Sequence, residues 1–306
     1  MTRTFHGLPV CDVLAALDRG EPLPPADKAA WRIALGYGHR EPFEAAWQRF
    51  LDAVDLVHVR ALVLGAWWPG EYDGLAGPLA AITGAAGRLP ALEALFLGDV
   101  EAEECEISWL EMCDITPVFE VFPHLTDLTV RGGSGLRLRP VRHGRLRTLA
   151  FESGGLPGEV VRALGGSELP ALDTLDLWLG VDEYGGDHGL ADLAPFLTGT
   201  RLPALRTLGL QNSEYQDDIA AAVAQAPVVA RLERLALGLG VLTDEGAAAL
   251  LAGQPLTHLA ALDLHHHYLT EPMRQRLRDA LPGVALDLSG AEDEEDEEDR
   301  YVAVSE

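Results

Sequence analysis

Leucine and other aliphatic residues recur along this chain in a fixed spacing, written L-x-x-L-x-L. The spacing is clearest at Leu205, Leu208 and Leu210, within the stretch 201–212. In an extended strand, alternate side chains point to opposite sides, so the last two leucines of a triad point together towards a core. The triads are Val59, Leu62, Leu64; Leu92, Leu95, Leu97; Leu125, Leu128, Val130; Leu146, Leu149, Phe151; Leu172, Leu175, Leu177; Leu205, Leu208, Leu210; Leu232, Leu235, Leu237; and Leu259, Leu262, Leu264, with a degenerate copy at Leu286 and Leu288.

Helix-forming segments lie between these triads. The triads begin at intervals of 21 to 33 residues, which leaves room for a strand and a short helix in most copies. Thr243 is an N-cap candidate before an Ala- and Leu-rich segment, and Gly253 suits the end of that helix. Predicted helices cover residues 79–87, 117–121, 158–164, 190–197, 219–225, 246–251 and 271–281. Such units cannot bury their apolar sides alone and stack on their neighbours, so we predict an α/β solenoid with a parallel inner sheet and outer helices.

The repeats resemble a known class. The stretch 242–251, followed by Leu256 and by the triad in 259–264, is similar to leucine-rich repeats of the ribonuclease-inhibitor type. The resemblance to uncharacterised bacterial leucine-rich-repeat proteins extends over residues 59–290. It implies a horseshoe fold and partner binding, and it supplies no catalytic residues.

One detail departs from that class. An asparagine often follows the strand in leucine-rich repeats, and we match it to Asn212, whereas Gly132 and His267 replace it in other copies. We therefore expect the loops after those strands to differ from the usual geometry.

Three regions are predicted along the chain. Residues 1–55 form a leader and a cap, because residues 31–35 alternate as in a strand and residues 43–54 carry apolar side chains at helical spacing. Residues 56–290 form the leucine-rich-repeat solenoid. Residues 291–306 contain eight consecutive acidic residues and form an acidic disordered tail, either a solubility device or a lure for a basic partner.

Charge limits the kinds of partner. The formal net charge of the 306-residue chain is −25, and −17 remains without the residues from position 292 onwards. Such a field repels phosphate backbones and anionic lipids, so nucleic acid and membranes are disfavoured and a basic protein surface is favoured. Three cysteines without metal-ligand spacing, and the lack of a signal-like or membrane-spanning apolar run, lead us to expect a reduced, cytoplasmic protein.

The inner face of the predicted sheet holds the first candidate binding residues. Positions between the core leucines present Asp176, Trp178, Gln211, Asp263 and His265. Trp178 is either an apolar anchor for a partner or a ring tucked beneath the loop that follows.

Long loops supply the second set of candidates. Tyr184 and Tyr215 lie in loops that combine aromatic and acidic residues and leave the same edge of the sheet. Aromatic rings give contact area at low entropic cost, and the flanking acids select a basic partner. The alternative is that these loops are solvated and their rings pack on neighbouring strands.

A histidine cluster provides the chemical alternative. Asp263, His265 and His267 could hold a metal ion, although His267 also suits a hydrogen bond within its turn. We predict no metal, cofactor or catalytic residue, and a monomeric, non-enzymatic module that binds a basic protein through its inner face and loops. The alternatives are a metal-dependent enzyme or accessory protein using these three residues, and an acidic mimic of nucleic acid.

Overall fold

A computed structural model describes residues 2–35, 40–69, 73–292 and 300–306. Its strands form one twelve-stranded sheet in which neighbours in sequence are neighbours in space. The first pair is antiparallel, and the later pairs are parallel. The strands are β1 Thr4–Phe5, β2 Leu8–Asp12, β3 Ala30–Ile33, β4 Ala61–Leu64, β5 Ala94–Leu97, β6 Asp127–Arg131, β7 Thr148–Glu152, β8 Thr174–Gly180, β9 Thr207–Ser213, β10 Arg234–Ala236, β11 Ala261–Asp263 and β12 Ala285–Asp287.

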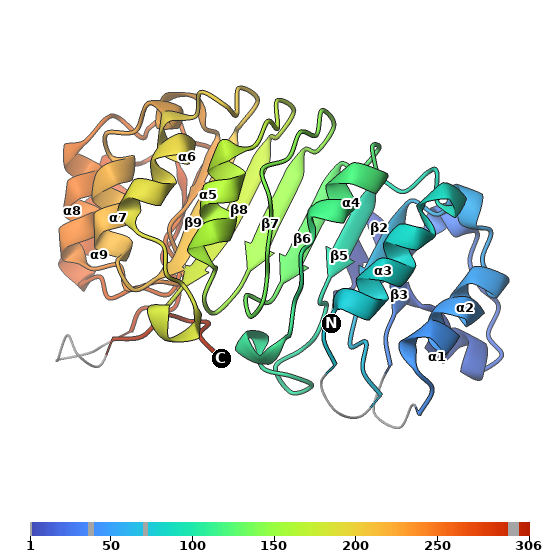
Figure 1. Cartoon of the computed structure of the whole chain (residues 1–306). Helices are drawn as coiled ribbons and strands as arrows, with labels where there is room; N and C mark the ends of the chain where they lie inside the picture. Colours follow the sequence, from blue (N-terminus) through green and yellow to red (C-terminus); the bar gives the residue numbers. More distant parts are fainter. Residues whose placement is uncertain (1, 36–39, 70–72, 293–299) are drawn as a thin grey trace.

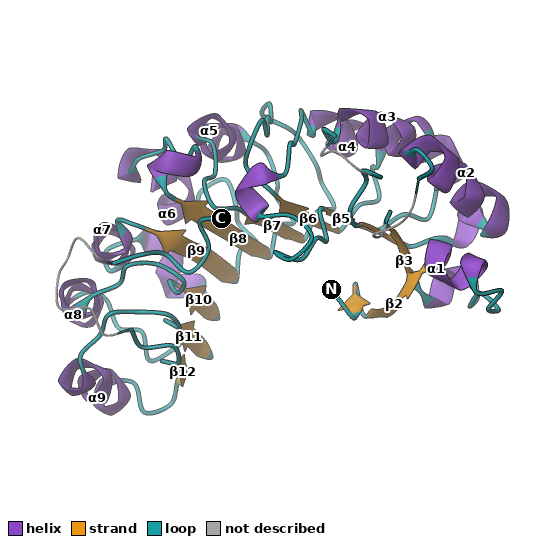
Figure 2. Cartoon of the chain, turned by 90° about the horizontal axis from the view of Figure 1, so that it is seen from below, coloured by secondary structure: helices purple, strands orange, loops and turns teal. Residues whose placement is uncertain are grey.

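Helices cover the outer side of this sheet. Figure 2 shows the strands along the inside of a curved ribbon and the helices along its outside. The α-helices are α1 Val13–Asp18, α2 Phe43–Ala53, α3 Ala76–Gly84, α4 Thr116–Val121, α5 Gly158–Gly166, α6 Ala194–Thr198, α7 Gln216–Val223, α8 Asp244–Ala252 and α9 Glu271–Ala280. Short 3-10 helices occupy Ala26–Lys28, Leu56–His58, Ala86–Arg88, Ile107–Trp109, Asp182–Tyr184, Leu190–Leu193 and Pro227–Arg231. The chain is therefore an α/β, leucine-rich-repeat-like solenoid.

Local sequence explains where several helices begin and end. The hydroxyl of Thr243 accepts a hydrogen bond from the backbone of Glu245 at 3.2 Å, which caps α8 as predicted. Thr270 caps α9 in the same way. The described segment between β6 and β7 has no helix, because its repeat interval of 21 residues is the shortest in the chain.

The predicted core is confirmed by the register of the strands. Leu175 of β8 aligns with Leu208 of β9, which aligns with Leu235 and then Leu262. In the eight complete triads every side chain is at most 2% exposed. Burying one leucine stabilises a fold by roughly 1.5–3 kcal/mol, so the stacked triads supply the main favourable term. Leu286 and Leu288 are only partly buried, because they lie at the end of the stack.

The N-terminal end of the sheet curls over its own inner face. Figure 2 shows β1 and β2 turning inward from β3. Phe5 packs on Phe96 of β5, with ring centroids 5.9 Å apart. These rings enclose a small second core with inner-face residues Ala30, Ala61, Val63 and Ala94. The first part of the inner face is therefore closed, and the remainder from β6 onwards carries polar side chains.

Part of the segment predicted to be disordered has defined contacts. Residues 293–299 lie outside the described residues, whereas residues 300–306 pack against loops of the solenoid. Among the described residues, no helix has both the length and the apolarity needed to cross a membrane.

Candidate functional site

The seven predicted binding residues fall into two groups. Asp176 and Trp178 of β8, Gln211 of β9, Asp263 of β11 and the adjacent His265 lie on the inner side of the sheet, as the alternation of side chains required. Tyr184 and Tyr215 instead lie in the loops beyond the carboxyl ends of β8 and β9. The structure thus separates an inner-face site from a loop edge.

A row of inner-face positions gathers the acidic residues. Register pairs Asp176 with Gly209, Gly209 with Ala236, Ala236 with Asp263, and Asp263 with Asp287. The two small residues leave a low floor between the carboxylates at either side. Neighbouring strands are about 4.8 Å apart, so Asp176 and Asp263 are separated by three strand spacings, on the order of 14 Å. We call Asp176, Trp178, Gln211, Asp263, His265 and Asp287 the inner acidic patch.

Asp176 is the most buried charge in this patch. Burial raises the pKa of its carboxyl group, the carboxylates of Glu152 and Asp263 raise it further, and the hydrogen bond from Gln211 opposes them. That bond runs from Nε2 of Gln211 to Oδ1 of Asp176 at 2.8 Å. A β carbon at Gly209 would lie 2.0 Å from the same Oδ1, so only glycine leaves the carboxylate this room.

One hydrogen-bond acceptor of the Gln211 side chain has no partner among the described residues. Its side chain is 6% exposed on the inner face, and its Oε1 has no hydrogen-bond partner among the described residues. A buried acceptor without a partner costs free energy, and Nε1 of Trp178, the residue paired with Gln211 in register, is likewise buried without a partner among the described residues.

Trp178 lies one pleat beyond Asp176 and next to Gln211. Trp178 and Gln211 are paired in register, and Trp178 is partly exposed while its Nε1 is buried. Its backbone carbonyl accepts a hydrogen bond from Ser153 at 3.2 Å, which ties β8 to the loop after β7. The ring therefore borders the acidic floor.

At the far side of the patch, Asp263, His265 and Asp287 come together. Their candidate metal-ligand atoms all lie within 4.8 Å of one another. Nδ1 of His265 is 2.7 Å from Oδ1 of Asp263, and Oδ1 of Asp287 accepts hydrogen bonds from the backbone and hydroxyl of Ser289. Asp287 was not among the residues predicted from the sequence, although the degenerate triad of Leu286 and Leu288 places it between two core positions.

His267 does not join this cluster, which contradicts the alternative of a metal site built from Asp263, His265 and His267. The side chain is fully buried, and Nε2 lies 3.2 Å from the carbonyl of Leu288. Its Nδ1 accepts a hydrogen bond from the backbone of Leu269 at 3.1 Å. The alternative role, a hydrogen bond within the turn, is the one that the structure supports.

Tyr215 is held in the loop edge by a second histidine. Its hydroxyl contacts Nδ1 of His188, while Nε2 of His188 lies 3.1 Å from the carbonyl of Leu179. Burial raises the pKa of the Tyr215 hydroxyl and lowers the pKa of His188. A neighbouring hollow of about 420 Å³ is lined by acidic residues including Asp187 and Asp218. The ring packs against the core and presents little free surface.

Tyr184 is bonded to the segment 300–306. Its hydroxyl donates to Oε1 of Glu306 at 2.6 Å, and this contact raises the pKa of Tyr184 to about 12. Asn212 also contacts this segment. Its amide bonds the carbonyl of Ser153 at 3.1 Å and the backbone of Val304.

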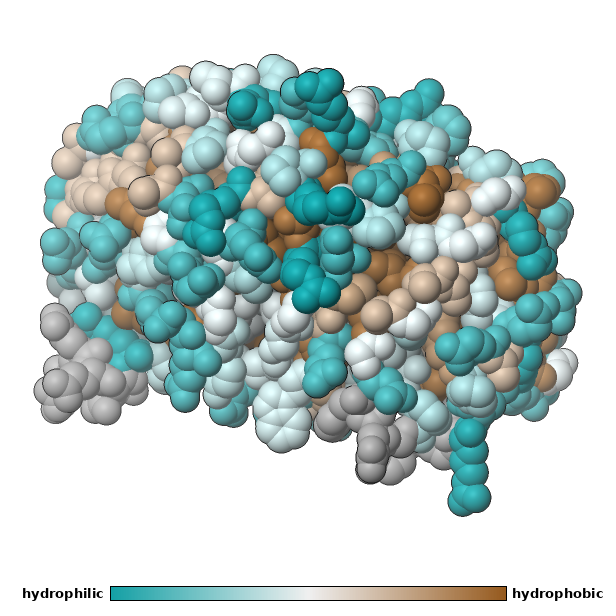
Figure 3. Space-filling view, in the orientation of Figure 1, coloured by the Kyte–Doolittle hydropathy of each residue, from teal (hydrophilic) through white to brown (hydrophobic). Residues whose placement is uncertain are grey.

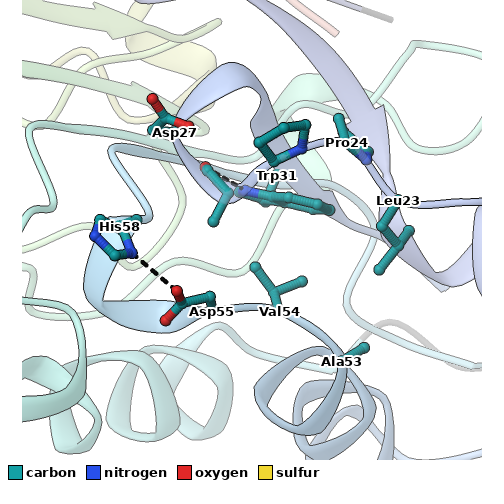
Figure 4. Close-up of a pocket in the computed structure, with 10 residues that line it drawn as sticks. Leu23, Pro24, Asp27, Trp31, Ala53, Val54, Asp55 and His58 are labelled. Carbon is teal, nitrogen blue, oxygen red and sulfur yellow. Dashed lines mark hydrogen bonds and ion pairs between the residues drawn. The ribbon is translucent and has the colours of Figure 1, made fainter.

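A larger hollow lies away from both groups. This pocket of about 550 Å³ opens beside the first repeats and is lined by Trp31, Val54 and the chain around Pro24 (Figure 4). The indole of Trp31 already donates to the carbonyl of Ala26 at 3.0 Å, and His58 pairs with Asp55 at 2.9 Å. Its polar groups are satisfied locally, so we do not assign it a binding role.

Comparison with known proteins supports the fold and leaves the function open. A scan against protein-family models and a search of curated proteins give no match. A solved Bacteroides fragilis protein is similar with a TM-score of 0.81 and 29% sequence identity, over 92% of this chain and 82% of that one. A match to a Listeria monocytogenes internalin covers 76% of this chain and 82% of the internalin at 15% identity. Its TM-score of 0.28 is too low to indicate a shared fold. Over most of its length, then, this chain is similar in fold to a solved bacterial protein whose description names no activity.

Proposed function

We propose that this chain is a non-enzymatic protein-interaction module whose inner acidic patch binds a basic segment of a partner protein. The observation that carries the proposal is the row formed by Asp176, Asp263 and Asp287, with only Gly209 and Ala236 between the first two carboxylates. One lysine or arginine side chain over this row would meet the Asp176 carboxylate, and a second one would meet Asp263 and Asp287.

Other features of the patch favour the same kind of ligand. Trp178 is partly exposed and offers an aromatic face to a cation or an aliphatic stem. The net charge of −25 attracts basic surfaces over longer distances. The helix-bearing side shows hydrophilic side chains with apolar ones scattered between them, rather than one broad apolar patch (Figure 3). We therefore assign partner binding to the inner face.

The test uses a ten-residue oligolysine as the probe. Its binding is followed by tryptophan fluorescence, and only the part of the change that disappears in Trp178→Phe is counted. This part reports on the inner face and not on binding elsewhere on the protein. The variant D176N/D263N removes two carboxylates of the patch, and we expect about tenfold weaker binding, since an exposed to partly buried ion pair contributes roughly 0.5–1 kcal/mol. Binding also weakens as salt is raised.

The matched control is D52N/D279N. Asp52 and Asp279 are exposed on α2 and α9, and each accepts a hydrogen bond from a glutamine four residues earlier. This variant has the same net charge as D176N/D263N and leaves the inner face unchanged. Equal weakening by the two double variants would reduce the effect to overall charge, and the proposed site would be wrong.

The second candidate function is metal binding by Asp263, His265 and Asp287. Their proximity favours it, although Asp263 and His265 already bond each other. Metal content after incubation with zinc separates the two functions. Stoichiometric zinc that disappears in His265→Ala, and persists in the control His258→Ala on the loop before β11, would establish the metal site.

A further inference from the structure

Residues 300–306 lie as an extended segment along the loop edge, away from the inner acidic patch. Figure 1 shows the red end of the chain crossing below the carboxyl ends of the later strands. The segment meets the end of β9 and the loops that follow β10 and β11, and its last residues reach the loops after β7 and β8. A β carbon at Gly154 would come within 2.0 Å of the Ser305 carbonyl, so the segment also needs glycine at this point.

The edge recognises this segment mainly through its main chain. The Tyr301 backbone amide donates to the hydroxyl of Tyr268 at 3.0 Å, and its carbonyl lies 3.1 Å from Nε2 of His266. The amide of Ala303 donates to the carbonyl of Leu239 at 2.8 Å. Main-chain contacts of this kind are shared by any extended peptide.

Asn212 binds the next residue from both sides. Its Oδ1 accepts the backbone amide of Val304 at 3.0 Å, and its Nδ2 donates to the carbonyl of the same residue. The Asn212 side chain is completely buried. One amide group thus satisfies both polar groups of one peptide residue, which fixes the position of the segment along the edge.

Side chains of the segment alternate between the edge and solvent. Val302 is 4% exposed, and Val304 packs partly buried against the main core. Tyr301, which precedes Val302, and Ala303, which lies between the two valines, are exposed. Selectivity therefore rests on two positions, which accept small apolar side chains two residues apart.

The backbone of the edge is strained where it meets the segment. Asn212, Leu239 and His266 have positive φ values of 58°, 64° and 53°, and they are three of the four non-glycine residues with positive φ in the described chain. They occupy the same position in three successive repeats, seven residues after the first leucine of each triad, so His266 and not His267 is the counterpart of Asn212. Left-handed conformations cost free energy in residues with a β carbon and cluster at binding sites. Here each strained residue supplies a contact to residues 301–304.

We infer that Asn212, Leu239, His266 and Tyr268 form a second binding site, which takes an extended peptide with small apolar side chains at two alternate positions. Segment 300–306 of this chain occupies that site as an intramolecular competitor. A partner peptide of this pattern must displace it, so the site is autoinhibited.

The experiment uses the full chain and a fluorescent peptide with the sequence Arg-Tyr-Val-Ala-Val-Ser-Glu of residues 300–306. The variant V302D/V304D places charges in the two apolar positions and releases the segment. We expect this variant to bind the peptide at least about tenfold more tightly than the unchanged protein, in which the site is occupied. Equal binding to both proteins, or no binding to the released variant, would overturn the inference.

Two single variants test the contacts themselves. In the released background, Tyr268→Phe removes the hydroxyl that binds Tyr301, and we expect about three- to tenfold weaker peptide binding. As the control, Thr83→Val removes a hydroxyl on the outer helix α3 that donates to the carbonyl of Leu79, and it leaves peptide binding unchanged. Equal effects of the two variants would overturn the assignment of the site.

Hydrogen exchange keeps the test valid if the released variant does not fold. In the unchanged protein, the amides of Ala303 and Val304 exchange more slowly than in the free peptide, and Tyr268→Phe accelerates them while Thr83→Val does not. Exchange at the rate of the free peptide would overturn the inference. Sedimentation of the unchanged protein as a dimer with the same protection would assign the segment to a second copy and overturn the intramolecular occupancy.

Discussion

Replacing Arg32 by methionine tests how the N-terminal end of the sheet is held. The Arg32 side chain is 3% exposed and lies between two carboxylates. Nε donates to Oδ2 of Asp99 at 2.9 Å, and one terminal nitrogen donates to Oδ2 of Asp12 at 3.0 Å. Asp99 is itself 2% exposed and also accepts hydrogen bonds from Thr2. The guanidinium thus joins β2, β3 and the loop after β5.

The expected loss follows from what the substitution leaves behind. Methionine fills much of the volume of Arg32, but the Asp99 carboxylate stays buried without its cation, which costs about 3–5 kcal/mol of unfolding free energy at pH 7. Burial alone would raise the pKa of Asp99, and hydrogen bonds from Thr2 and Arg32 outweigh it and hold that pKa below its usual value. The native carboxylate therefore stabilises the fold at neutral pH, and this contribution is lost as pH falls through the lowered pKa.

Urea unfolding followed by tryptophan fluorescence measures this effect, because five of the six tryptophans lie before residue 110. The loss of unfolding free energy in R32M becomes smaller as pH is lowered, because the unpaired Asp99 carboxylate then takes up a proton. The double variant R32M/D99N has an unfolding free energy at least about 2 kcal/mol higher than that of R32M, because it no longer buries an unpaired charge. The control Arg142→Met breaks an exposed pair with Glu168 and costs less than about 1 kcal/mol. A cost for R32M as small as this control would refute the reasoning.

Three further predictions concern single side chains. Burial raises the pKa of Asp176, so the charge of this carboxylate destabilises the fold above that pKa. We expect D176N to raise the thermal midpoint of unfolding at pH 7 by about 2 °C and to give no gain below the unfolded pKa of 3.8. A lower midpoint at pH 7 would contradict this. H267A costs about 2–3 kcal/mol in urea unfolding by leaving backbone groups of Leu269 and Leu288 unpaired. Because burial lowers the pKa of His267, its contribution to stability falls as pH drops below 6.5, and a pH-independent loss would argue against this role. Burial raises the pKa of Cys105 and Cys113 to about 11, so Ellman's reagent at pH 8 labels these two thiols only when the protein unfolds, and it labels the half-buried Cys11 before them. Rapid labelling of all three cysteines in the folded protein would contradict this prediction.

The sequence located the inner-face residues but not their partners. Alternation along a strand placed Asp176, Trp178 and Gln211 on one side, because the period of two follows from local backbone geometry. It gave no sign that Gln211 would bond Asp176 on the neighbouring strand, or that Asp287 rather than His267 would approach His265. Those pairings depend on register and on the direction of each strand end.

What the sequence by itself determined is the repeating unit: a strand whose leucines face a core, followed in most copies by a helix. This was possible because each repeat contacts chiefly its neighbours, so one short pattern specifies the stack. Only the tertiary structure decided how the ends of the stack are covered. Phe5 packs on Phe96, and Val304 bonds Asn212 across 92 positions of sequence. Contacts of such long range depend on the curvature summed over many repeats, and no local spacing encodes that sum.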